Sequence, residues 1–381
     1  MENAAVVGIG MTGIEANKMA DTYADMAWEA VNKALDDAGM TIEDVDNVVT
    51  TSNDFWDGRT ISCMAVGDAS GACKKNVSCV EGDGTFGAFY GLTRILSGAY
   101  GTTLITAHSK GSESVSSLIT NAAFDPIYAR PLGMDMVTAC AMQANAYMHR
   151  TGATSKQLAR VSVKNHGNAR HNRHAQLAME ITVDDVLNSE MIADPLHKLD
   201  CSPVSDGCCA IVIAGESRAA RCRSKPVWIK GVSFCSDAYH LGDRDLSRAP
   251  SLEHAARRTY AMAGITDPKK DIDVAEVYDA FTYQELMWIE GLGLAGDGEA
   301  GPLVEEGAFD IKGGMPVNPS GGLLSGHPVI AAGLIRIAEV VRQLRGEAGG
   351  YQVDGATTGI AQGVNGLCGQ SHCVWVLSRA K

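Results

Sequence analysis

The sequence contains no long uninterrupted apolar run and no cluster of basic side chains. A membrane-spanning helix needs about 18 or more consecutive apolar residues, and no window approaches that length. The 381 residues include 45 Asp and Glu against 32 Lys and Arg, which gives a formal charge of −13. Phosphate backbones are bound by clustered Lys and Arg. We therefore expect neither a membrane nor a nucleic acid as a partner.

The sequence also lacks the marks of export and of a metal-binding framework. Its first residues do not combine a basic segment with a long apolar stretch, as a secretory signal would. The 11 cysteines are odd in number and scattered, and the closest pair, Cys208 and Cys209, does not have zinc-ligand spacing. These absences predict a cytoplasmic protein with reduced thiols and no metal in this chain.

The first part of the chain alternates between strand-like and helix-like patterns. Many of the 42 glycines lie at the ends of apolar runs, as in folds where strands and helices alternate through tight turns. The segment 84–96 is made almost wholly of small and apolar residues, which predicts a helix buried on all sides. The patterns predict strands at 5–8, 47–51, 75–80 and 210–214 and helices at 21–38 and 84–96.

The alternation is interrupted once and then repeats. Residues of about 107–200 form an excursion that we expect to build a lid or pocket wall. After a polar linker at 216–225, the patterns predict strands at 227–234, 272–278 and 372–377 and helices at 251–263 and 333–344. We therefore expect a duplicated α/β fold in five layers, α/β/α/β/α, with an N-terminal half at 1–215 and a C-terminal half at 225–381.

Long ordered stretches of the second half carry a resemblance to a known family. They are LDCSPVSDGCCAIVIA (199–214), VAEVYDAFTYQELMWIEGLG (274–293), PVNPSGGLLSGHP (316–328) and VRQLRGEAGGYQV (341–353). Together they resemble the thiolase superfamily, in its sterol-carrier-protein-type and archaeal branch, and the likeness runs through nearly the whole chain. The resemblance implies the duplicated thiolase fold and coenzyme A, in an acyl-CoA, as substrate.

The resemblance assigns three catalytic candidates. Members of the family use a cysteine at the N-terminus of a buried helix, a histidine in a Gly-His-Pro turn and a second acid/base group. His327 lies in such a turn, and Tyr278 stands where relatives carry His or Asn. Cys368, in the glycine loop near the C-terminus, is the candidate for the second proton-transfer group, with His372 as the alternative.

The nucleophilic cysteine of the family has no clear counterpart. Counting back through the glycines of the 84–96 helix places Glu81 at its position, whereas the preceding Val-Glu pair places Gly84 there. An acyl-glutamate would be a mixed anhydride, so Glu81 suits the removal of a proton from a thiol, water or hydroxyl better than covalent catalysis. The open alternative is that Cys79 occupies this position.

The resemblance also implies a binding surface for the CoA ester. Relatives carry a Lys-Asn-His segment that lines this site, and His166 is its counterpart here. The Ser320, Gly321 and Gly322 segment precedes the Gly-His-Pro turn. Its glycines let the backbone approach a cavity closely, and we expect it to contact CoA.

The activity that the resemblance implies is CoA-dependent retro-Claisen cleavage, or the reverse condensation, of a 3-oxoacyl-CoA. An aroyl-substituted substrate such as 2-benzoylsuccinyl-CoA, from anaerobic aromatic degradation, is the specific expectation. Two alternatives stay open: a retro-aldolase acting on a β-hydroxyacyl-CoA, and a non-catalytic acyl-CoA-binding scaffold. Relatives also imply a homodimeric core and a small partner subunit with a zinc ribbon and an OB-fold.

Overall fold

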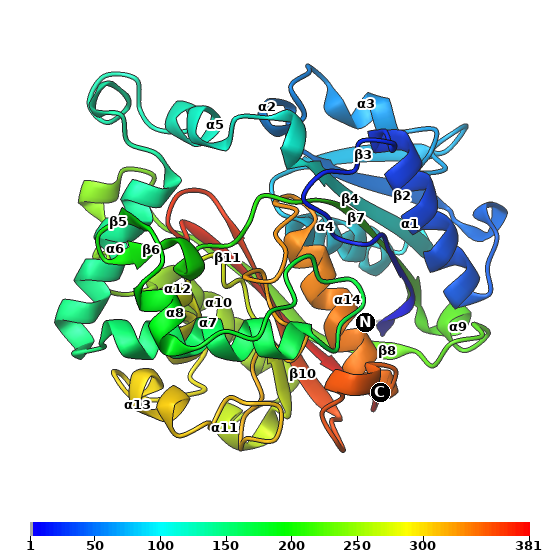
Figure 1. Cartoon of the computed structure of the whole chain (residues 1–381). Coiled ribbons are helices and arrows are strands. Elements are labelled where there is room, and N and C mark those ends of the chain that lie inside the picture. Colours follow the sequence, from blue (N-terminus) through cyan, green and yellow to red (C-terminus); the bar gives the residue numbers. More distant parts are fainter. Residues whose placement is uncertain (1–2) are drawn as a thin grey trace.

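The computed structural model describes residues 3–381, in which nine strands form one large mixed sheet (Figure 1). The strand order is β3-β2-β4-β7-β1-β8-β11-β10-β9, so strands from both ends of the chain meet in the middle of the sheet. The strands are β1 (Ala4–Met11), β2 (Asn47–Ser52), β3 (Asn76–Glu81), β4 (Thr102–Lys110), β7 (Asp206–Gly215), β8 (Val227–Ser236), β9 (Val274–Glu276), β10 (Thr358–Asn365) and β11 (Ser371–Ser378).

The sheet has two halves that are joined by a short seam. β1 pairs with β8 over only two residue pairs, Ala5 with Trp228 and Val6 with Val227. By contrast, β1 pairs with β7 from Ala4 to Met11, with one register shift, and β10 and β11 pair along their whole lengths. The N-terminal half mixes parallel and antiparallel neighbours, because β2 is parallel to β3 and β4 while β4 is antiparallel to β7.

Helices cover both faces of each half and build the five layers. α1 (Tyr23–Ala38) packs on the outer face of the N-terminal half. α4 (Gly84–Leu96) and α14 (Ala332–Arg345) lie between the two halves and share one apolar cluster with strands of both. α10 (Pro250–Ala263) and α12 (Thr282–Gly291) pack in the third cluster, on the other face of the C-terminal half.

The small residues of α4 explain why it can lie so deep in the molecule. A Cβ atom at Gly87 would come within 2.0 Å of the Oγ1 atom of Thr51, and one at Gly91 within 2.8 Å of Ile105. Glycine at these positions lets the helix backbone approach the sheet closely. The close approach places the N-terminus of α4 beside that of α14, in the interior of the molecule.

The excursion between β4 and β7 consists mainly of helices. α6 (Met136–Thr151) and α7 (Ser155–Ala169) contact α12, whereas α5 (Ser116–Ala122) lies at the edge of the molecule, at the top of Figure 1. The remaining short elements are α2 (Asp54–Asp57), α3 (Ser62–Val66), α8 (Val183–Leu187), α9 (Glu216–Ala219), α11 (Pro268–Asp271), α13 (Ala300–Glu305), β5 (Met191–Ala193) and β6 (Leu196–His197).

The layered α/β architecture matches the expectation from the sequence, with two differences in the strands. The pattern at 272–278 predicts a longer strand than β9, which ends at Glu276 and leaves Tyr278 in the following loop. The strands β4 and β10, each of which has a neighbour on both sides in the sheet, were not predicted. The division at 215–225 stays a prediction. None of the described helices is long and apolar enough to cross a membrane.

Candidate active site

A cavity of about 510 Å³ opens between elements of both halves. Its wall includes residues of α2, the β3–α4 turn, α5, the start of α6, the segment before β7, the β9–α12 connection, the segment before α14 and the β10–β11 turn. Four of the residues predicted from the sequence line it: Glu81, Tyr278, His327 and Cys368. The fold therefore brings together side chains that are as many as 287 positions apart.

Three side chains form a hydrogen-bonded chain in the cavity wall. The Nε2 atom of His327 lies 2.8 Å from the phenol oxygen of Tyr278, and its Nδ1 atom lies 2.9 Å from the Oγ atom of Ser202. The backbone N–H of His327 donates to the Oγ atom of Ser205 at 2.8 Å. The imidazole is thus fixed at both ring nitrogens and at its backbone. Neither serine was identified from the sequence.

Burial determines the protonation states in this chain. It lowers the pKa of His327 to about 3, with the positive charge of Arg336 as the second cause, so the imidazole is neutral near pH 7. Burial also raises the pKa of Tyr278 well above its ordinary value, so its side chain stays a phenol. The phenol O–H can then donate to Nε2 while Nδ1–H donates to Ser202. The arrangement can carry a proton along the chain in either direction.

The backbone of Tyr278 is held by side chains in place of strand partners. Its N–H donates to the Oε1 atom of Gln362 at 2.7 Å, and its carbonyl accepts from the indole N–H of Trp288 at 2.8 Å. Gln362 also bonds the Nδ1 atom of His372, whose ring meets Trp288 edge-on at 4.5 Å. His372 does not line the cavity, so it supports Tyr278 from behind.

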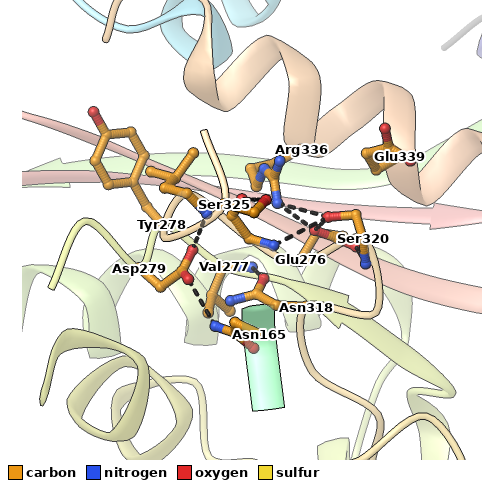
Figure 2. Close-up of polar contacts among 12 residues, drawn as sticks. Asn165, Glu276, Val277, Tyr278, Asp279, Asn318, Ser320, Ser325, Arg336 and Glu339 are labelled. Carbon is orange, nitrogen blue, oxygen red and sulfur yellow. Dashed lines mark hydrogen bonds and ion pairs between the residues drawn. The ribbon is translucent and has the colours of Figure 1, made fainter. Parts of the chain in front are cut away.

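A buried polar network surrounds this backbone, as Figure 2 shows. Glu276 forms an ion pair with Arg336 and accepts from the Oγ atom of Ser320 at 2.7 Å. On the other side of Tyr278, Asp279 accepts from the N–H of Leu323 at 2.6 Å and from the Nδ2 atom of Asn165 at 2.7 Å. The carboxylates on both sides of Tyr278 therefore bind the loop that leads to His327.

The predicted CoA-contacting segment belongs to this network and lies outside the cavity wall. Ser320, Gly321 and Gly322 are not among the lining residues. Gly322 has a φ of 62°, and a Cβ atom there would come within 2.2 Å of the Asp279 carboxylate. His166 is likewise outside the wall, with its Nδ1 atom 3.2 Å from the carbonyl oxygen of Leu177. CoA contact by these residues stays a prediction.

The N-terminus of α4 presents a carboxylate that the sequence analysis did not identify. Asp83 caps the helix by accepting from Thr85, and it also accepts from the N–H of Gly333 at 2.7 Å, so it joins the N-termini of α4 and α14. Burial raises its pKa to about 6. The Asp-Gly-Thr sequence is an N-cap signal that could have indicated it. A Cβ atom at Gly84 would meet Leu334 at 2.6 Å, so that position has no room for a cysteine side chain without rearrangement.

The two residues considered for the nucleophile position lie in different surroundings. Glu81 ends β3, lines the cavity and accepts from the Nδ2 atom of Asn53 at 2.8 Å, but its side chain is exposed. Cys79 is also exposed, lies 3.4 Å from the Oγ atom of Ser52 and is absent from the cavity wall. Neither is a buried side chain at the start of α4.

Cys368 lies in the glycine-rich turn between β10 and β11. Its φ of 48° is in the left-handed region, and its carbonyl accepts from the Nε2 atom of Gln143 at 3.2 Å. The thiol is buried, lines the cavity and lies 3.8 Å from the sulfur of Cys140, which is behind it. Cys368 is therefore the cysteine placed to meet a bound ligand from this turn.

The architecture agrees with comparisons to known proteins. Residues 4–217 match the family model "Thiolase, N-terminal domain", and residues 234–379 match "Thiolase C-terminal domain-like". The chain belongs to the thiolase superfamily. Its sheet, its helices between the two halves and its flanking layers are those of the thiolase fold.

Among proteins of this superfamily, the chain is similar to an acetyl-CoA acetyltransferase of Methanothermobacter thermautotrophicus, with 35% identity over 100% of both chains. It is 37% identical to the benzoylsuccinyl-CoA thiolase subunit BbsB of Thauera aromatica, over 58% of each chain. A solved structure, the Ltp2-ChsH2(DUF35) aldolase, superposes with a TM-score of 0.85 at 28% identity, over 99% of this chain and 97% of that one. The thiolase relatives include both acyltransferases and an aldolase.

The described part of this thiolase-fold chain contains no candidate cluster of metal ligands. Residues 3–381 contain no group of three or more His, Cys, Asp or Glu side chains arranged to hold a metal ion. The polar groups that line the cavity include the hydroxyl, imidazole, thiol and carboxylate groups described above. Their chemistry is that of proton transfer and hydrogen bonding to an oxygen.

Proposed function

We propose that this chain is a CoA-dependent enzyme that cleaves a 3-oxoacyl-CoA by a retro-Claisen reaction, or catalyses the reverse condensation. The observation that carries the proposal is the Ser202–His327–Tyr278 chain, which shares one cavity with Cys368 while the start of α4 presents no cysteine. The proposal uses these side chains as proton-transfer groups and assigns no covalent nucleophile. The full-length similarity to an acetyl-CoA acetyltransferase supports the reaction type.

In this reaction the thiol of free CoA is the nucleophile. It gives its proton to the His327–Tyr278 pair, and its sulfur forms a bond to carbon 3 of the substrate. Tyr278 donates a hydrogen bond to the oxyanion that develops there. The bond between carbons 2 and 3 then breaks, and its electron pair moves to carbon 2 as a thioester enolate.

Cys368 completes the cycle by protonating the enolate. Two CoA thioesters result, and the proton taken from CoA returns from His327 to Cys368, so the enzyme is unchanged. Glu81, at the exposed end of β3, orients the incoming thiol for this transfer. Because no acyl-enzyme has to form, the 3-acyl group can be bulky and non-enolisable, as an aroyl group is.

The proposal includes a homodimeric core, a small zinc-ribbon and OB-fold partner subunit, and a cytoplasmic location. β3 is an edge strand with Val77 49% exposed, which is consistent with pairing between two copies. The similar Ltp2-ChsH2(DUF35) aldolase is named with a second protein, which supports a partner. Mass measurement of the protein isolated under native conditions tests both: a fully active monomer contradicts them.

The direct test of the reaction is its dependence on free CoA. Purified protein is mixed with an aroyl-substituted 3-oxoacyl-CoA, with and without CoA, and the thioesters are separated by chromatography. We expect two new thioesters, and only when CoA is present. Cleavage that proceeds without CoA contradicts the proposal.

The second candidate is a retro-aldolase that acts on a β-hydroxyacyl-CoA. It is favoured by the phenol of Tyr278 in place of the His or Asn of relatives, and by the likeness to an aldolase structure. The His327–Tyr278 pair would take the proton of the β-hydroxyl group, the bond between the α and β carbons would break, and Cys368 would protonate the enolate. CoA-independent release of an aldehyde or ketone would support this reaction. A scaffold role requires that substitutions of His327 and Tyr278 leave turnover unchanged.

A further inference from the structure

The cavity wall contains acidic side chains and no basic ones. Glu81, Asp83 and Asp135 line it, whereas no Lys or Arg of residues 3–381 does. Asp135 is half-buried and is the N-cap of α6, where its carboxylate accepts from the N–H of Thr138 at 2.9 Å. A negatively charged group that enters the cavity therefore meets no side-chain counter-ion in its wall.

Two arginines outside the wall, Arg244 and Arg130, are engaged with backbone carbonyls of its loops. Arg244 lies behind the β10–β11 turn, where its guanidinium donates to the carbonyl of Leu367 at 3.0 Å and lines a separate small hollow. Arg130 donates to the carbonyls of Ala122 and Phe124. These positive charges stabilise the loops around the cavity, and Arg336, whose charge acts on His327 from behind the wall, is paired with Glu276.

Apolar and aromatic side chains form much of the remaining wall. Phe55 and Trp56 come from α2, Phe281 from the segment that begins α12, and Tyr239 from the loop after β8. Phe281 is only 6% exposed, so this part of the wall is fixed in the core. Aromatic rings bind other aromatic rings well in offset or edge-to-face contact. Such a wall favours a flat, uncharged ring.

A carboxylate moved from water into this wall would lose hydration without gaining an ion pair. Burial of an unpaired charge is strongly unfavourable, because the attraction of a partner does not offset the desolvation. The three acidic side chains add repulsion. The wall thus disfavours substrates whose acyl chain carries a free carboxylate.

We propose that the cavity accepts an uncharged aromatic acyl chain and rejects an acyl chain that carries a free carboxylate. The inference rests on the proposed function and narrows its substrate class. Benzoylacetyl-CoA is of the accepted class. 2-Benzoylsuccinyl-CoA, the substrate expected from the sequence, carries a carboxylate and is of the rejected class.

The test compares 2-benzoylsuccinyl-CoA with its methyl ester, which has the same branching and no charge, and with benzoylacetyl-CoA. The protein is purified with whatever subunits accompany it, and kcat/KM is measured in the presence of free CoA. We expect kcat/KM for the methyl ester to exceed that for the free acid at least about tenfold. Equal values, or a preference for the acid, overturn the inference. Failure of the proposed function gives a different result, because then none of the three CoA thioesters is cleaved when CoA is added.

A charge variant tests the cause of the discrimination. Asp135→Asn removes a negative charge from the wall and keeps a good N-cap residue, so the preference for the methyl ester should fall about threefold. Asp185→Asn is the matched control, since Asp185 is an exposed capping-box carboxylate of α8 outside the cavity. An unchanged preference in Asp135→Asn, or an equal change in Asp185→Asn, contradicts the role of the cavity charges.

Discussion

The two halves of the chain contribute differently to the cavity. The C-terminal half supplies Tyr278, which is buried, and His327, which is half-buried, and the network of Glu276, Asp279 and Arg336 holds the segments that carry them. The N-terminal half supplies Glu81, which is exposed, and Asp83, whose oxygens accept from helix N–H groups. Most of the proton-transfer chain thus comes from the C-terminal half, with Ser202 of the N-terminal half bonded to His327, whereas Asp83 closes the helix ends.

On the proposed function, which uses no covalent nucleophile, this difference separates the acid/base groups from the helix ends. A position at the end of two helix dipoles favours negative charge, and here Asp83 takes that role as a cap. The acid/base groups Tyr278 and His327 come from the C-terminal half, and His327 is also held by Ser202 and Ser205 of the N-terminal half. The following predictions test the asymmetry, from the largest expected effect to the smallest.

Removal of the imidazole should have the largest effect. His327→Ala breaks the chain between Ser202 and Tyr278, and general acid/base groups contribute about 10²–10⁴-fold to rates. We expect kcat/KM for CoA-dependent cleavage to fall about 10³-fold, measured by product chromatography, while circular dichroism shows an intact fold. A loss below about tenfold would contradict the central position of His327.

Tyr278→Phe should lower kcat/KM about 10²-fold, because it removes the O–H that bonds Nε2 and the developing oxyanion. Since the two residues act as a unit, kcat/KM of the double variant Tyr278→Phe, His327→Ala should be about the same as that of His327→Ala alone. Losses that multiply would show that the two side chains act independently. The phenyl ring keeps the edge-on contact with the imidazole, so a packing defect is not expected.

Asp279→Asn tests the network through the pH dependence of stability. Burial, then the charge of Glu285, raises the pKa of Asp279 to about 7, while Arg336 and Lys164 oppose the rise. The folded state therefore binds the extra proton between about pH 4 and 7, and this contribution to stability is lost as the pH rises through that window.

The variant lacks this contribution, so the wild-type advantage in unfolding free energy should shrink as the pH rises from 4.5 to 6.5. The maximum slope is about 1.4 kcal/mol per pH unit, measured by urea denaturation at several pH values. A difference between the two proteins that does not change with pH would refute the assignment.

Substitutions on the N-terminal side should have the smallest effects. Glu81→Gln keeps the hydrogen bond to Asn53 and should lower kcat/KM by no more than about tenfold, as expected for a group that assists an exposed thiol. Cys79→Ala should leave kcat/KM unchanged, because this thiol lies outside the cavity wall. Inactivation by Cys79→Ala would contradict this account and would indicate that Cys79 is the covalent nucleophile.

The fold was predictable where local patterns and long motifs agree. The small-residue segment 84–96 predicts the buried helix α4, and the structure has the same bounds. β4 was missed because its threonines and His108 interrupt the apolar pattern. In the structure all of its residues are buried, and it pairs with β2 and β7. β9 was predicted too long because side-chain acceptors, Asn318 for Val277 and Gln362 for Tyr278, replace strand partners there.

The site was predictable only as far as motifs extend. His327 and Tyr278 were found through their flanking residues, and the structure places them in contact. Ser202 is 125 positions from His327, so no local spacing could pair them. Asp83 lies between Glu81 and Gly84, the two positions that the motif spacing selects for the replaced cysteine, so the spacing did not indicate it. Whether these residues have the proposed roles stays a prediction.

The central claim is that carbon–carbon bond cleavage proceeds here without an acyl-enzyme. The most direct measurement mixes the protein with a stoichiometric amount of an aroyl-substituted 3-oxoacyl-CoA in the absence of free CoA and records the intact protein mass within the first turnover. We predict an unmodified protein, no cleavage products, and prompt cleavage once CoA is added. An aroyl adduct on a cysteine, formed together with a burst of the second thioester, would contradict the account.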